Sequence, residues 1–143
     1  MEKKNIAILL SGGVGKRFGR AIPKQLHKLN GMTILEISLK KLLDCRLFFR
    51  IYIVAHKSIV EDLKSRYQKK NVKVISGGKE RQHSVFKALE KIKRTMPENV
   101  VIHDCVRPFF SNNFLWFSGS FLCGLFIINP SLIGVKVASI WIG

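Results

Sequence analysis

Short apolar segments alternate with amphipathic ones along the first 113 residues. The apolar segments are rich in Ile and Val, as buried strands of parallel sheets usually are, and they cover residues 5–10, 50–55, 72–75 and 100–103. Each is followed by residues with a different pattern, so strands and helices take turns along the chain. This order predicts an α/β fold with a Rossmann-like, mostly parallel sheet and helices on both of its faces.

The amphipathic segments predict helices, and they cover residues 33–43, 57–68 and 82–92. Thr33 followed by Glu36 is typical of a capping box at the start of a helix, and Ser58 is expected to cap the second helix. In the third segment Val85, Leu89 and Ile92 recur with the spacing of a buried helical stripe.

The pattern changes after residue 113. The last 30 residues contain a single charged residue, Lys136, and we expect a domain over residues 1–113 followed by an atypical apolar tail over 114–143. Three interpretations of the tail remain open. Residues 114–135 are long enough for a membrane helix but contain Pro130; residues 133–143 could add a strand; or the reading frame is disrupted after residue 113, which we favour.

The chain is strongly basic, with 25 Lys and Arg against 9 Asp and Glu and a net charge of +16. Such a balance favours an anionic partner, which could be nucleic acid, a membrane or a phosphorylated small molecule. The aromatic residues are concentrated in the tail and are not interleaved with the basic ones, which argues against nucleic-acid binding. Cys45, Cys105 and Cys123 have no disulfide or zinc spacing, so a cytoplasmic location is expected.

Three clusters of chemically active residues follow the predicted strands. "SGGVGKRFGRAIPKQ" follows the first strand, "GGKERQHSVFKAL" the third, and "VIHDCVRPF" contains the fourth. Ligands of parallel sheets bind beyond the carboxyl ends of the strands. The first cluster combines small residues with positive charges, as phosphate sites do. It is not a P-loop, because Arg17 replaces the required Ser or Thr, and it is not a dinucleotide fingerprint, because Phe18 replaces the third glycine.

These three clusters resemble the signatures of the 2-C-methyl-D-erythritol 4-phosphate cytidylyltransferase family, in the same order and with similar spacing. Ribitol 5-phosphate cytidylyltransferase, a close relative, shares them. The resemblance covers about residues 4–113 and implies a fold of the nucleotide-diphospho-sugar transferase type that is incomplete at the C-terminus. Cys105 and Val106 stand where the family usually has two alanines, and this bulkier pair is expected to crowd the pocket.

The resemblance also implies roles for individual residues. Arg17 and Lys24 would be catalytic and hold the triphosphate. The residues implied in nucleotide binding are Ser11, Gly12, Gly13, Gly15, Gly77, Gly78, Arg81 and Ser84. Of these, Gly77, Gly78 and Ser84 would read cytosine, although Ser84 could instead cap the following helix. Asp104 would help to place Mg²⁺ or a substrate hydroxyl, and Arg107 would meet the polyol phosphate.

The implied reaction transfers a cytidylyl group from CTP to 2-C-methyl-D-erythritol 4-phosphate, with Mg²⁺ as cofactor, in isoprenoid precursor synthesis by the non-mevalonate pathway. Members of the family are expected to form homodimers through an arm that the tail does not resemble. Weak or no turnover is therefore expected of this chain. Three alternatives remain open: a ribitol 5-phosphate cytidylyltransferase, a non-catalytic remnant and a basic nucleic-acid-binding module. No membrane partner is expected.

Overall fold

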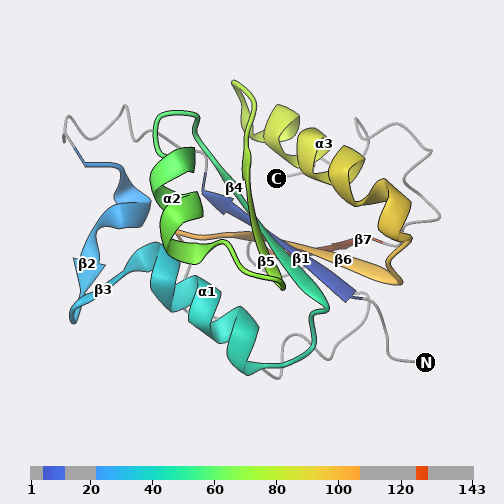
Figure 1. Cartoon of the computed structure of the whole chain (residues 1–143), viewed down its shortest axis with the longest axis horizontal. Coiled ribbons are helices and arrows are strands. Elements are labelled where there is room, and N and C mark those ends of the chain that lie inside the picture. The colour runs from blue at the N-terminus through green and yellow to red at the C-terminus, as the bar shows by residue number, and fades with distance from the viewer. Residues whose placement is uncertain (1–4, 12–21, 107–124, 129–143) are drawn as a thin grey trace.

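A five-stranded sheet forms the centre of the molecule in the computed structural model, which describes residues 5–11, 22–106 and 125–128 (Figure 1). The order of its strands is β5-β4-β1-β6-β7. Their bounds are β1 Asn5–Ser11, β4 Arg50–Ala55, β5 Val72–Ser76, β6 Asn99–Asp104 and β7 Leu125–Ile128. The first four run parallel and β7 runs antiparallel to β6. The predicted mostly parallel α/β sheet is confirmed.

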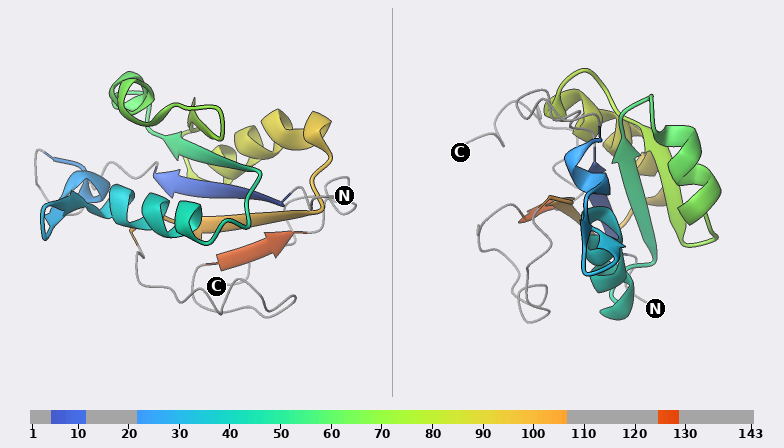
Figure 2. Two further views of the ribbon diagram at one scale, coloured as in Figure 1. Left: turned by 60° about the horizontal axis from the view of Figure 1, so that its bottom comes forward. Right: turned by 90° about the vertical axis from the view of Figure 1, so that its left-hand side faces the viewer.

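Both faces of this sheet are covered, which explains why its central strands are apolar without alternation. Helices α1 (Ile34–Asp44) and α2 (Val60–Tyr67) pack on one face, and α3 (Arg81–Ile92) packs on the other (Figure 2). On β1, Leu9 belongs to the core under α1 and α2, whereas Ile8 belongs to the core under α3. The predicted stripe of Val85, Leu89 and Ile92 lies in the second core and is confirmed.

The start of α1 follows the sequence prediction. The Glu36 backbone N–H donates to Thr33 Oγ1 at 3.1 Å, and the Thr33 N–H donates to Glu36 Oε2 at 2.7 Å. This reciprocal pair completes the predicted capping box and satisfies two N–H groups that the helix itself leaves unpaired.

The predicted cap of α2 is wrong. The helix begins at Val60, and Ile59 stands at its N-cap position with no side-chain hydrogen bond to the helix. Ser58 lies one residue too early, and its hydroxyl lies 2.8 Å from His56 Nδ1. The Ser58 N–H also donates to that ring nitrogen, at 3.2 Å. The imidazole therefore competes with the helix for this serine.

A small hairpin precedes α1 and was not predicted. The 3-10 helix η2 (Lys24–Leu26) leads into β2 (Lys28–Leu29), which pairs antiparallel with β3 (Met32–Thr33). Asn30 and Gly31 between them have φ angles of 50° and 83°, as a two-residue hairpin turn requires. Another 3-10 helix, η3 (Lys93–Thr95), extends α3.

The apolar tail contributes β7, which pairs with β6 from Val100↔Ile128 to His103↔Leu125. This strand lies before residues 133–143, the range in which a strand was considered. The rest of the tail lies outside the described residues, and the division at residue 113 stays a prediction. In the described part of the chain, no helix is long and apolar enough to cross a membrane.

Candidate functional site

The first and third motifs meet at the carboxyl end of β1. The Cys105 N–H donates to Leu10 O at 3.0 Å, and Gln25 Nε2 donates to Ser11 O at 2.9 Å. Two consecutive carbonyls of one central strand therefore hold residues from the segment before α1 and from the end of β6. This is the edge at which parallel sheets bind their ligands.

An ion pair joins the second motif to the third. Arg81 Nη1, at the start of α3, lies 3.6 Å from Asp104 Oδ2, at the end of β6. The side chains are 39% and 23% exposed, so this pair remains open to solvent and its energy is modest. Asp104 Oδ1 also accepts the Val106 N–H at 3.2 Å. The predicted convergence of these two motifs is thus visible in the contacts.

The Gly77–Gly78 turn is held from both sides. The Gly77 N–H donates to Ala55 O at 2.8 Å, and the Gly78 N–H donates to Ser84 Oγ at 3.1 Å. Both amides are used inside the protein, and Gly77 O already accepts from Lys87 Nζ at 3.1 Å and from Ser76 Oγ at 3.4 Å. The turn therefore offers a bound base the carbonyl oxygen of Gly78 rather than its N–H groups.

Ser84 holds this turn and is not a helix cap, so that alternative is wrong. Helix α3 starts at Arg81 with Glu80 at its N-cap position, and Ser84 lies within the helix, 4% exposed. Its hydroxyl donates to Glu80 O at 3.1 Å while it accepts the Gly78 amide. A serine at this depth therefore couples the turn to the first turn of α3.

The turn leaves no room for side chains. A Cβ on Gly77 would lie 2.6 Å from Ser84 Oγ, and a Cβ on Gly78 would collide with His83. Glycine is therefore required here by close packing rather than by a positive φ angle.

Of the predicted phosphate-binding residues, the structure describes Ser11 and Lys24. Ser11 ends β1 with its side chain 2% exposed. Lys24 is exposed and opens η2. Several predicted residues lie outside the described part of the chain, namely Gly12, Gly13, Gly15, Arg17 and Arg107.

Cys105 does not crowd this edge of the sheet, contrary to the expectation. Its side chain is 1% exposed and belongs to the core that contains Leu35 and Leu39. The Ser38 hydroxyl, on α1, donates to Cys105 O at 2.9 Å. Burial raises the pKa of the Cys105 thiol to about 12, and the neighbouring Asp104 carboxylate adds to this shift. The thiol is therefore part of the packing.

Sequence analysis did not single out Gln25 or Ser38. A signal existed for Ser38, because it shares the apolar face of α1 with Leu35, Leu39 and Leu42, where an unpaired hydroxyl would be costly. Gln25 is 2% exposed, and its signal was its place at the end of the first motif, beside Lys24.

The family model described as 2-C-methyl-D-erythritol 4-phosphate cytidylyltransferase matches residues 5–116. The chain belongs to this family. A cytidylyltransferase of that name from Petrotoga mobilis is 41% identical over 112 residues, and one from Thermosipho melanesiensis is 39% identical over 111 residues. Each alignment covers 75% of this chain and 49% of the relative.

Solved structures of the 2-C-methyl-D-erythritol 4-phosphate cytidylyltransferase family share the fold. The crystal structure of the Francisella tularensis enzyme matches with a TM-score of 0.63 and 32% identity, covering 79% of this chain and 49% of that one. The 4-diphosphocytidyl-2C-methyl-D-erythritol synthase of Anaerococcus prevotii matches with a TM-score of 0.63 and 26% identity, covering 80% and 49%. The predicted fold type is confirmed. The chain spans about half the length of the relatives it matches.

Asp104 is the candidate metal ligand in this member of the cytidylyltransferase family. Among the described residues there is no group of three or more His, Cys, Asp or Glu side chains that could hold a metal ion. Mg²⁺ in nucleotide sites is usually bound by one or two carboxylates together with the phosphates of the substrate. A single carboxylate at the end of β6 fits that kind of site, in which the nucleotide supplies most of the ligands.

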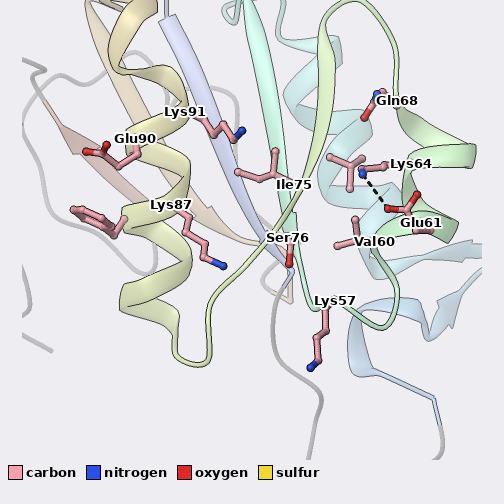
Figure 3. Close-up of a pocket in the computed structure, with 12 residues that line it drawn as sticks. Lys57, Val60, Glu61, Lys64, Gln68, Ile75, Ser76, Lys87, Glu90 and Lys91 are labelled. Carbon is pink, nitrogen blue, oxygen red and sulfur yellow. Dashed lines mark hydrogen bonds and ion pairs between the residues drawn. The ribbon is translucent and has the colours of Figure 1, made fainter.

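A groove of about 920 Å³ lies beside this site, between α2 and α3 along the β5 edge of the sheet (Figure 3). Its rim carries Lys57, Lys64, Lys87 and Lys91, and Lys64 Nζ lies 2.9 Å from Glu61 Oε1. None of the predicted site residues lines it. Lys87 links the groove to the site, because its Nζ donates to Gly77 O at 3.1 Å.

Proposed function

We propose that this chain binds CTP with Mg²⁺ and carries the nucleotide half of a cytidylyltransferase that acts on 2-C-methyl-D-erythritol 4-phosphate. The reaction would transfer the cytidylyl group to the phosphate of the polyol and release pyrophosphate. Membership of the family supports this activity, and the Gly77–Gly78 turn supports the choice of base.

The turn supports cytosine over uracil because it offers acceptors. Cytosine carries an amino group at C4, which donates hydrogen bonds, whereas uracil carries a carbonyl oxygen there, which only accepts them. The carbonyl oxygen of Gly78 would accept from the amino group and repel the uracil oxygen.

Positive charge would drive the chemical step. An oxygen of the polyol phosphate attacks the α-phosphorus of CTP, a new P–O bond forms, and the bond to the leaving pyrophosphate breaks. Lys24, together with Arg17, would neutralise the charge that builds up on the phosphate oxygens. Such preorganised charges act without a covalent enzyme intermediate.

Asp104 would hold Mg²⁺ together with oxygens of the triphosphate. When bound, the ion neutralises phosphate charge and makes pyrophosphate a better leaving group. Arg81, paired with Asp104, would keep that carboxylate at the mouth of the site. Arg107 would contact the phosphate of the polyol.

The direct test is calorimetric titration with CTP, UTP, ATP and GTP in the presence of Mg²⁺. We expect CTP to bind most tightly, and equal affinity for all four would remove the cytosine pocket from the proposal. Arg17→Ala and Lys24→Ala should each weaken CTP binding far more than Lys69→Ala. The last is a matched control, since Lys69 is exposed and lies just before β5.

A pyrophosphate-release assay identifies the acceptor. Methylerythritol phosphate is the acceptor that the family favours, and ribitol phosphate is the alternative. Because the chain spans about half of its relatives, we expect slow turnover or none, along with retained CTP binding. Turnover on the order of 1–10³ per second, as in ordinary enzymes, would show that these residues also position the acceptor.

A further inference from the structure

Gln25 is a buried polar side chain that joins two parts of the first motif. It is 2% exposed and is the buried residue of η2. Its Nε2 donates to Ser11 O at 2.9 Å, across 14 positions of the sequence. Burying a side-chain amide costs free energy unless its polar groups are hydrogen-bonded, so buried amides are found with their partners.

The residue that Gln25 holds in place is Lys24. Both belong to η2, in which the Leu26 N–H donates to Pro23 O at 2.9 Å and the His27 N–H donates to Lys24 O at 3.1 Å. These bonds fix the local shape of the turn. They do not fix its position relative to β1. The bond from Gln25 to Ser11 does so, together with Leu26, which packs against the core that contains Leu9 of β1.

The far end of this hydrogen bond is itself rigid. Ser11 pairs with Ala55 of β4, and the carbonyl of Leu10, one residue earlier, accepts the Cys105 N–H at 3.0 Å. Ser11 O therefore belongs to the central sheet, from which the position of Lys24 is set.

We propose that Gln25 is a positioning residue, whose amide N–H fixes the Lys24 ammonium relative to the carboxyl end of β1 so that it can hold the triphosphate. This role rests on the proposed CTP binding. A preorganised charge stabilises phosphate oxygens more than one that must be ordered during binding, so the loss of this tether should weaken binding through Lys24.

Gln25→Glu tests the hydrogen bond without a change of size. An ionised carboxylate cannot donate to Ser11 O and repels it, whereas a protonated carboxyl can donate. We expect CTP affinity to fall about tenfold once the introduced carboxyl ionises, which corresponds to the loss of one hydrogen bond to a buried carbonyl. Affinity should recover as the pH is lowered, relative to the wild type at each pH. Gln25→Leu should lose affinity at every pH.

A double variant with Lys24→Ala distinguishes a positioning role of Gln25 from a general effect of Gln25 on stability. In the Lys24→Ala background, Gln25→Glu should cause no further loss of CTP affinity, because the group that it positions is gone. Thr33→Ala is the matched control: it removes the buried capping hydroxyl of α1 and should lower the unfolding midpoint while leaving CTP affinity unchanged.

The outcomes are distinct. A wild-type chain that binds no nucleoside triphosphate overturns the proposed function and this role with it. A wild-type chain that binds CTP in a Lys24-dependent way, with Gln25→Glu binding equally well at every pH, overturns the role of Gln25 alone. A Gln25→Glu loss that is equally large without Lys24 shows that Gln25 acts on stability and not on Lys24, and this also overturns the proposal.

Discussion

At the scale of single residues, the Gly77–Gly78 turn shows how packing can prepare a binding surface. Its amides are consumed by Ala55 O and Ser84 Oγ, which leaves the Gly78 carbonyl oxygen for a ligand. The Lys87 ammonium donates to Gly77 O at 3.1 Å and so helps to fix the direction of that carbonyl. The selectivity proposed for the site therefore depends on internal hydrogen bonds as much as on the groups that touch the base.

Gly77→Ala tests this dependence. The new Cβ would lie 2.6 Å from Ser84 Oγ, so the hydroxyl must move and the Gly78 amide loses its acceptor. We expect about 1–3 kcal/mol of lost folding free energy, the usual range for overpacking, together with weaker CTP binding. Thermal unfolding and calorimetry measure the two effects.

Two further variants show whether Ser84 is the cause. Ser84→Ala removes the atom that the new methyl group would strike, so the double variant should lose less than the sum of the single losses. Lys79→Ala, at an exposed neighbour of the turn, should change neither property. Strict additivity of the two losses would mean that Ser84 is not the cause of the Gly77→Ala effect.

Sequence reasoning identified Gly77, Gly78 and Ser84 as a group, but it left open a capping role for the serine that the structure contradicts. A serine near the start of a helix can be a cap or can lie in the first turns, and spacing alone does not distinguish the two. The burial of Gln25 was not predicted at all, because it depends on contact with β1, 14 residues earlier. Residue types in a motif indicate chemistry, whereas burial depends on the fold.

At the scale of elements, a carboxylate couples α1 to α2. The Tyr67 hydroxyl donates to Glu36 Oε1 at 2.7 Å, and Glu36 also accepts the Thr33 N–H in the capping box. The backbone bond from Thr33 and the bond from Tyr67 lower the pKa of Glu36 from its usual 4.5. Burial, followed by the Glu36 carboxylate, raises the pKa of Tyr67 to about 12.

Tyr67→Phe should therefore change how stability depends on pH. The pKa of Glu36 is lower in the folded than in the unfolded chain, so its contribution is present above pH 4.5 and is lost as the pH falls through the folded value. The pKa of Tyr67 is higher in the folded chain, so its contribution to stability is present below pH 10 and is lost as the pH rises from 10 to about 12. We expect Tyr67→Phe to lower the free energy of unfolding by about 1 kcal/mol at pH 7. It should also reduce the loss of stability at acidic pH and the loss at alkaline pH, both measured by denaturant unfolding.

Glu36→Gln provides the comparison for Tyr67→Phe. It removes this titrating group but keeps a carbonyl oxygen that can accept from the Tyr67 hydroxyl. Its stability should therefore depend less on acidic pH than that of the wild type, and in this background Tyr67→Phe should cost only a neutral hydrogen bond, which is weaker than a bond to a carboxylate. If Tyr67→Phe costs as much without the carboxylate as with it, the charge of Glu36 does not strengthen the link between α1 and α2.

The same elements show what sequence could and could not provide. The capping box of α1 joins residues three apart, and it was predicted correctly because it is local. The Tyr67 link spans 31 positions and depends on the packing of α2 beside α1, so no local pattern indicated it. The predicted cap at Ser58 was wrong because α2 begins at Val60, with Ile59 at its N-cap position, and the Ser58 hydroxyl pairs with the neighbouring His56 ring.

At the scale of the whole molecule, the sheet combines two kinds of sequence. Strands β1, β4, β5 and β6 come from the region with alternating strand and helix signals, and they were predicted near their observed bounds. Strand β7 comes from the apolar tail, where uniform hydrophobicity gives no period by which to recognise a strand. Its antiparallel pairing with β6 was therefore not predicted.

The burial of Cys105 makes it a sensor of how often the molecule opens. Alkylating reagents attack thiolates, and a thiol with a pKa of about 12 that is 1% exposed yields almost none at neutral pH. Labelling at Cys105 therefore requires the end of β6 to separate from Ser38 on α1, so the labelling rate counts openings of the site itself.

In a Cys45→Ser, Cys123→Ser background, we expect Cys105 to label far more slowly than Cys45 labels in the wild type, where it is only partly buried. CTP should slow the labelling of Cys105 further, because a ligand that binds the closed form makes openings rarer. Labelling of Cys105 as fast as that of Cys45 would show that the end of β6 separates from α1 freely. The labelling rate of one buried sulfur atom thus reports how often the binding site opens.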